Sequence, residues 1–63
     1  MCEANVYITK GEKEELFLEQ VDIILPEGDE FFLQNIYGEQ KNIKAELKEI
    51  SLLDHRIVLK PKE

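Results

Sequence analysis

The chain alternates short apolar runs with turn-forming residues, a pattern that predicts β-strands rather than a helical bundle. In the first run, Val6 and Ile8 alternate with Tyr7 and Thr9, as in a strand with one buried face. The next four residues, Lys10–Lys13, contain a glycine and are typical of a hairpin turn. We therefore expect the chain to begin with a β-hairpin.

Three further strands are predicted before residue 40. The run Glu15–Glu19 returns from the hairpin, and the run Val21–Leu25 has its apolar residues at positions 21, 23 and 25 on one face. Pro26–Asp29 combines a proline with a glycine and is the strongest turn signal of the chain. A strand over Glu30–Ile36 follows and ends in a second glycine turn, Tyr37–Glu39.

The segment Asn42–Ile50 fits both a strand and a helix. Ile43, Ala45 and Leu47 alternate as in a strand, whereas Ile43, Leu47 and Ile50 repeat as on one side of a helix. The Lys, Ala, Glu and Leu that dominate the segment favour a helix. We nevertheless favour a strand, because an isolated helix of this length is marginal and the neighbouring strands offer hydrogen-bonding partners.

The last predicted strands are Ile50–Leu53 and Ile57–Leu59, which the polar link Asp54–Arg56 joins. Five or six short strands in one small chain must curl to cover a shared apolar face. The sequence therefore predicts an all-β fold in which residues 1–63 form a single domain, a small barrel of the SH3-like or Sm-like kind.

The size of the chain predicts self-association. A core built from 63 residues rarely supplies more than roughly 3–5 kcal/mol, so such domains usually add a disulfide, a metal or a second subunit. A single cysteine cannot form an internal disulfide and indicates a reducing compartment. The chain opens without a basic region or an apolar run, so we expect neither a signal peptide nor a membrane span, and a cytoplasmic location.

The charge of the chain restricts its partners. The net charge is −6, and residues 1–31 carry nine acidic and two basic side chains, whereas residues 32–63 carry five acidic and six basic ones. Phosphate-rich nucleic acids and anionic membranes bind mainly through basic clusters, so this composition disfavours both. Cations and basic protein surfaces are the expected partners.

Cys2 is the residue with the most distinctive chemistry. If the initiator methionine is removed, as is usual before small residues, Cys2 carries both a free amine and a thiol, and together they close a five-membered ring on a metal. If the methionine is retained, a deprotonated backbone amide can take the place of the amine. Two copies of Cys2 across a two-fold axis would supply two sulfurs and two nitrogens, a set that suits square-planar nickel or copper. This hypothesis predicts a homodimer.

The other candidate residues fit structural roles. We expect His55, the only histidine, to be an exposed turn residue that bonds locally, since no second histidine or cysteine gives a zinc-site spacing. The acidic turn Glu27–Glu30 lacks the ligand pattern of a calcium loop. No phosphate-binding loop or serine–histidine–acid pattern is present, so an enzyme is not expected. Five aromatic residues have the spacing of core residues rather than of a base-stacking platform: Tyr7, Phe17, Phe31, Phe32 and Tyr37.

Several segments together resemble the CooT family of small bacterial and archaeal proteins, namely Met1–Tyr7, Val21–Asp22, Pro26–Asp29, Ile36–Lys41 and Leu53–Leu59. This resemblance implies a nickel-binding homodimer with a small barrel fold, associated with the supply of nickel to carbon monoxide dehydrogenase. It also implies that the metal ligand is the cysteine after the initiator methionine, which is Cys2 here. The expected metal is therefore Ni(II).

Two other functions remain open from the sequence. Some relatives are labelled as predicted RNA-binding proteins, and an RNA-binding module would need a basic face built from Lys41, Lys44, Lys48, Arg56, Lys60 and Lys62. A structural dimer or a protein-interaction module would use an exposed strand edge, and Cys2 would then be incidental.

Overall fold

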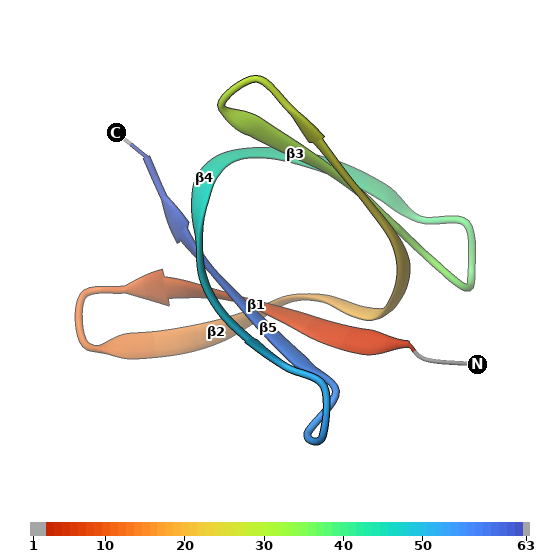
Figure 1. The fold of residues 1–63 in the computed structure, drawn as a ribbon, viewed down its shortest axis with the longest axis horizontal. Helices are drawn as coiled ribbons and strands as arrows, with labels where there is room; N and C mark the ends of the chain where they lie inside the picture. The colour runs from red at the N-terminus through yellow and green to blue at the C-terminus, as the bar shows by residue number, and fades with distance from the viewer. Residues whose placement is uncertain (1–2, 63) are drawn as a thin grey trace.

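Five β-strands account for most of the computed structural model, which describes residues 3–62 (Figure 1). They are β1 (Ala4–Lys10), β2 (Lys13–Glu27), β3 (Glu30–Asn35), β4 (Gln40–Ser51) and β5 (Arg56–Pro61). Each strand pairs with the next in antiparallel fashion, and β5 pairs with β1 in parallel, which closes the sheet into a barrel. The prediction of a small all-β barrel is confirmed, with five strands. Residues 3–62 include no helix that could cross a membrane.

β2 is one long strand where the sequence predicts two. Gln20 has a φ of +55°, and its amide donates a hydrogen bond of 3.1 Å to Oδ1 of Asn5, so the strand bends at this point without ending. The register of pairing to β3 also shifts between Val21 and Ile23. Val21 and Ile24 therefore face the core while Ile23 is exposed, and the predicted shared face of residues 21, 23 and 25 is wrong.

The ambiguous segment Asn42–Ile50 lies within β4, as predicted. It forms ladders with β3 on one side and β5 on the other, and these hydrogen bonds outweigh its helical propensity. Ala45 is its buried residue. The predicted strand Ile50–Leu53 is correct only to Ser51, because the following four residues form the turn into β5.

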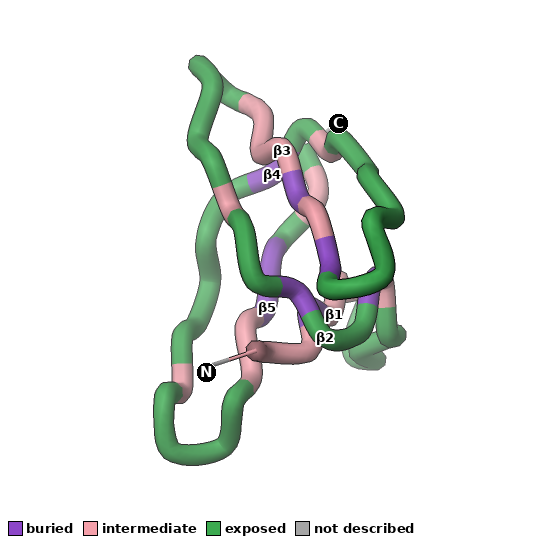
Figure 2. The backbone as a smooth tube through the Cα atoms, turned by 90° about the vertical axis from the view of Figure 1, so that its right-hand side faces the viewer, coloured by how far each residue is buried: buried purple, intermediate pink, exposed green. Residues whose placement is uncertain are grey.

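The core is a small cluster to which every strand contributes. Figure 2 shows the buried segments along the middle of the molecule, with exposed turns at its ends. The buried hydrophobic residues are Val6, Leu18, Val21, Leu33, Ala45, Val58 and Leu59. Phe17 and Phe31 are partly buried and pack against this cluster, so the prediction that the aromatics fill the core is confirmed for these two. It is wrong for Tyr37, which is exposed, and Tyr7 and Phe32 are only partly buried and are not among the described residues that pack against the cluster.

Asn35, at the end of β3, is the buried polar residue among residues 3–62. Its Oδ1 accepts hydrogen bonds from the amides of Tyr37 (3.1 Å) and Glu39 (2.9 Å), and its Nδ2 donates to Oε1 of Glu39 (2.7 Å). A buried amide side chain is stable when its donors and acceptors are satisfied in this way. Asn35 thus fixes the turn between β3 and β4.

The parallel pairing of β1 with β5 brings the residues before β1 next to the turn between β4 and β5. Asn5 is opposite Arg56, and Ile8 is opposite Leu59, so both strands begin at the same end of the barrel. The residues before β1 therefore lie next to the β4–β5 turn, which is formed by residues 52–55.

Candidate functional site

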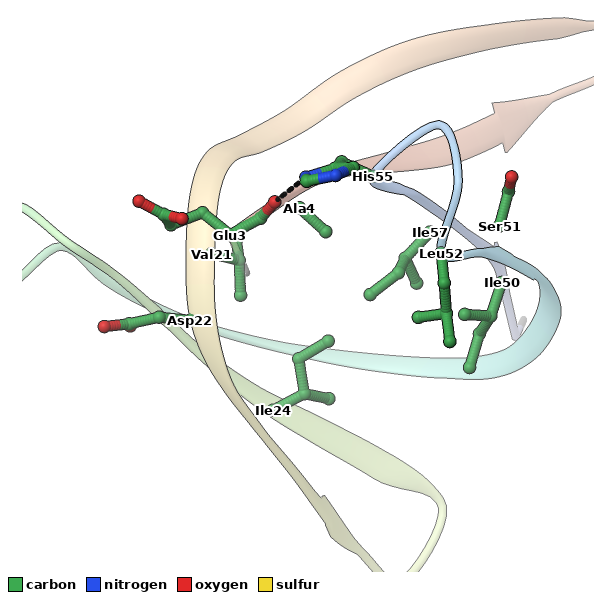
Figure 3. A pocket seen from close by; sticks show the side chains of 10 residues that line it. All are labelled: Glu3, Ala4, Val21, Asp22, Ile24, Ile50, Ser51, Leu52, His55 and Ile57. Carbon is green, nitrogen blue, oxygen red and sulfur yellow. Dashed lines mark hydrogen bonds between the residues drawn. The ribbon is translucent and has the colours of Figure 1, made fainter. Parts of the chain in front are cut away.

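Two hydrogen bonds join the start of the chain to the β4–β5 turn. The amide of Asn5 donates to the carbonyl oxygen of His55 at 2.9 Å, and Nδ1 of His55 lies 3.0 Å from the carbonyl oxygen of Glu3 (Figure 3). The partners in the second contact are 52 positions apart in the sequence. His55 is exposed, as predicted, but the expectation that it bonds locally is wrong.

The backbone of His55 adopts an unusual conformation. Its φ of +53° lies in the left-handed region, which residues other than glycine occupy uncommonly, although histidine, asparagine and aspartate do so more often than the rest. Such strain costs on the order of 1 kcal/mol and persists where surrounding contacts hold it. Here the contacts are the hydrogen bonds to Glu3 and Asn5, which fix both the turn and the orientation of the imidazole.

A cavity of about 350 Å³ opens beside this junction. Figure 3 shows the apolar side chains of strands β2, β4 and β5 directed into it, with His55 at its edge. Its apolar lining consists of Ala4, Val21, Ile24, Ile50, Leu52 and Ile57. The surface beside the junction of Glu3 with His55 is therefore mainly hydrophobic.

The β4–β5 turn carries apolar side chains into solvent. Leu52 is 85% exposed and Leu53 is 90% exposed, and Ile50 just before them is also exposed. We call these three residues the apolar tip. Exposed apolar residues that adjoin one another, next to an apolar cavity, are typical of a surface that contacts a partner.

Cys2, the predicted metal ligand, lies outside the described residues. It directly precedes Glu3, and consecutive Cα atoms are about 3.8 Å apart, so it is attached to the chain at the His55 junction. Within residues 3–62, no group of three or more His, Cys, Asp or Glu side chains is placed to hold a metal ion.

Half of the basic residues between positions 32 and 63 make contacts with other residues of the chain. Arg56 forms ion pairs with Glu14 and Glu49 and lies over the ring of Tyr7. The Nζ atom of Lys41 donates to the carbonyl oxygen of Phe17 at 2.9 Å, and Lys44 pairs with Asp29 of the acidic turn at 3.7 Å. Three of the six basic residues that an RNA-binding face would need are thus occupied by neighbours in the chain.

The chain is similar to known proteins over nearly its whole length. Residues 1–60 match the model of a family described as the CO dehydrogenase accessory protein CooT. The structure is also similar to the crystal structure of a protein assigned as CooT from Carboxydothermus hydrogenoformans, with 48% sequence identity and a TM-score of 0.92 over 98% of this chain and 100% of that chain. No curated protein matches the sequence.

Proposed function

This chain belongs to the CooT family of CO dehydrogenase accessory proteins, and from that premise we propose that it binds Ni(II) through Cys2 and supplies it for the maturation of carbon monoxide dehydrogenase. The observation that supports the proposal most directly is that Glu3, the residue after Cys2 in the sequence, contacts His55 and lines the same cavity as Ile50 and Leu52 of the apolar tip. In this proposal the chain carries nickel and catalyses no reaction itself; carbon monoxide dehydrogenase, the protein that receives the nickel, is the enzyme.

One chain would provide only part of the coordination sphere. Cys2 can donate its sulfur and one nitrogen, whereas square-planar Ni(II) takes four ligands. A second copy related by a two-fold axis supplies the remaining two, and in such an interface the same surface patch occurs on both sides. The chain is therefore proposed to act as a homodimer in which both copies of Cys2 contribute to one metal site.

The apolar tip is the surface proposed to join the two copies. It adjoins Glu3 through the same cavity, so a dimer that buries Leu52 and Leu53 also brings the two chain starts to one side of the assembly. Burial of an exposed leucine contributes about 1.5–3 kcal/mol. Glu3, which follows Cys2 in the sequence, thus lines the same cavity as Ile50 and Leu52, two of the residues proposed to join the copies.

The surroundings of the site favour cation capture and release. The chain has a net charge of −6, and Glu3 and Asp22 both line the cavity, so the local field attracts a divalent cation. Glu3 and His55 are at least partly exposed, so an approaching client protein has access to this end of the barrel. A nickel ion bound by a thiolate of this chain can pass to a thiolate or an imidazole of the client protein once these groups are close enough to bind it.

Replacement of Cys2 by serine tests the proposal. The variant removes the sulfur and leaves residues 3–62 unchanged, so we expect nickel binding to be lost while the thermal unfolding midpoint stays within a few degrees of the wild type. Nickel-loaded wild-type protein should also activate a nickel-free carbon monoxide dehydrogenase, and the serine variant should not. Full nickel affinity in the serine variant would refute the proposal.

A further inference from the structure

We propose that β4 binds an extended basic segment of a partner protein as an additional β-strand, along its edge over residues 46–51. This inference goes beyond the proposed function, because it concerns a protein-docking edge and can be tested on metal-free protein. The carrying observation is that this half of β4 has a hydrogen-bonded strand on one side only. We call residues 46–51 the open edge.

β4 changes its neighbouring strand along its length. Residues 40–44 pair with β3, and residues 45–51 pair with β5. Because β3 begins at Glu30, no strand among residues 3–62 continues on its side of β4. The backbone bond that ends this side joins the amide of Ala45 to the carbonyl oxygen of Asp29 at 3.2 Å. An edge with unpaired amides and carbonyls is where an extended segment adds to a sheet.

The open edge borders an apolar surface. Leu47 is opposite Leu59 and Ile50 is opposite Ile57, and the register shifts between Leu47 and Glu49. Positions 57 and 59 share one face of β5, so the shift also places Leu47 and Ile50 on one face although they are three positions apart. That face is the core side, since Leu59 is buried. Leu47 and Ile50 are nevertheless 50% and 51% exposed, so this surface is only half covered.

The cavity beside Ile50 has room for side chains of an added strand. Val21 and Ile24 of β2 line it together with Ile50 of β4 (Figure 3). A cavity of about 150 Å³ holds a benzene molecule, and this one has a volume of about 350 Å³. Alternate side chains of a strand point to the same face. The segment that fits therefore has an apolar residue at every second position.

Acidic residues lie near both ends of the open edge. Asp29 and Glu30 lie where β3 starts, and Asp29 is hydrogen-bonded to Ala45 through its backbone. Glu3 and Asp22 line the cavity that Ile50 also lines. Charges across an interface are usually complementary, which favours the matching partner over others. The segment that fits therefore has basic residues between its apolar ones.

A second copy of the chain is a poorer occupant of the open edge. An antiparallel pairing of two copies that is centred on Lys48 or on Glu49 places like charges opposite each other. A pairing centred between them avoids this, but it sends the two copies of Ser51 to opposite ends of the ladder, roughly 17 Å apart. The proposed dimer requires instead that the β4–β5 turns of the two copies meet. A lysine on an edge also limits indiscriminate pairing.

A synthetic peptide of alternating lysine and valine, acetylated and amidated at its ends, tests the proposal. We titrate it into metal-free, isotope-labelled protein and follow the backbone amides by NMR. We expect shifts at residues 46–51 and at the cavity, with slower hydrogen exchange of the open-edge amides. A peptide with N-methylated valines should bind at least about tenfold more weakly, because backbone hydrogen bonds are lost. A peptide of alternating glutamate and valine should also bind at least about tenfold more weakly at low salt.

A pair of variants locates the binding surface. Leu47→Ser should weaken binding of the lysine–valine peptide roughly threefold to tenfold, because half of a leucine is available for burial there. Leu25→Ser is the matched control, since Leu25 is 48% exposed but lies on β2 and does not line the cavity, and it should bind as the wild type does. Thermal unfolding checks that both variants are folded.

Three results would overturn the proposal. They are no binding at millimolar lysine–valine peptide, shifts confined to other parts of the barrel, and equal binding of the N-methylated peptide. Slow exchange of the open-edge amides in the dimer without peptide would also overturn it, because a second copy would then cover the edge. Cys2→Ser should bind the peptide as the wild type does, so a failure of nickel binding and a failure of peptide binding are distinguishable.

Discussion

Replacement of Leu53 by serine should dissociate the proposed dimer without unfolding the barrel. Leu53 is 90% exposed in the single chain, so its burial against a second copy would contribute nearly the full value for a leucine, about 1.5–3 kcal/mol. A two-fold interface contains this residue twice, so the substitution removes roughly 3–6 kcal/mol from the association free energy. At about 1.4 kcal/mol for each factor of ten, the dissociation constant should rise roughly 100-fold to 10,000-fold.

Sedimentation velocity over a concentration series measures this change. Leu16→Ser is the matched control, because Leu16 is also an exposed leucine, at 53%, but lies on β2 away from the apolar tip. Both variants should unfold within about 0.5 kcal/mol of the wild type, as is usual for exposed positions. An unchanged dissociation constant in Leu53→Ser, or an equal loss in Leu16→Ser, would refute the assignment of the dimer surface to the apolar tip.

Three further predictions concern the fold and are checked by thermal unfolding, where 1 kcal/mol moves the midpoint by about 4–8 °C. Leu33→Ala empties a fully buried core position and should cost about 2–5 kcal/mol, so a midpoint within a few degrees of the wild type would contradict the described core. Asn35→Ala leaves the amides of Tyr37 and Glu39 without their acceptor and should cost about 1–3 kcal/mol; no loss would mean that these bonds do not hold the turn. Gly28→Ala should cost about 1 kcal/mol through its φ of +63° alone, since no atom lies near the added methyl group, and a stabilised variant would contradict that conformation.

The strand pattern of the chain is largely readable from its sequence, because alternation of apolar residues and glycine turns are local signals. The hairpin turn at Gly11 and the turn at Gly28 both occur with positive φ, as their sequences indicate. The segment Asn42–Ile50 shows that local signals alone do not always decide between a helix and a strand. Its composition favours a helix, and only the neighbouring strands, which offer a ladder on either side, decide for β4.

The bend in β2 could not be read from the sequence. Gln20 is neither glycine nor asparagine, so nothing local indicates its positive φ, and the side chain of Asn5 that supports the bend comes from another strand. The register shift that follows exchanges the buried and exposed sides of the strand. This is why Ile24 packs against the core and Ile23 does not.

The candidate site was predictable only in part. The chemistry of Cys2 follows from its residue type and its position in the sequence, and no described contact tests it. The neighbourhood of His55 depends on the parallel pairing of β1 with β5, a contact between the two ends of the chain that no local pattern reveals. The position of His55 within a family-like segment, Leu53–Leu59, was the available signal, but it did not indicate a contact with Glu3.

The central claim is that one nickel ion is bound between two copies of Cys2. The most direct test is a titration of Ni(II) into reduced, untagged protein, followed by nickel–thiolate charge-transfer absorption and by the mass of the intact complex. The account predicts thiolate absorption that saturates at one nickel per two chains, with a mass of two chains and one metal. Saturation at one nickel per single chain, or binding without thiolate absorption, would contradict it.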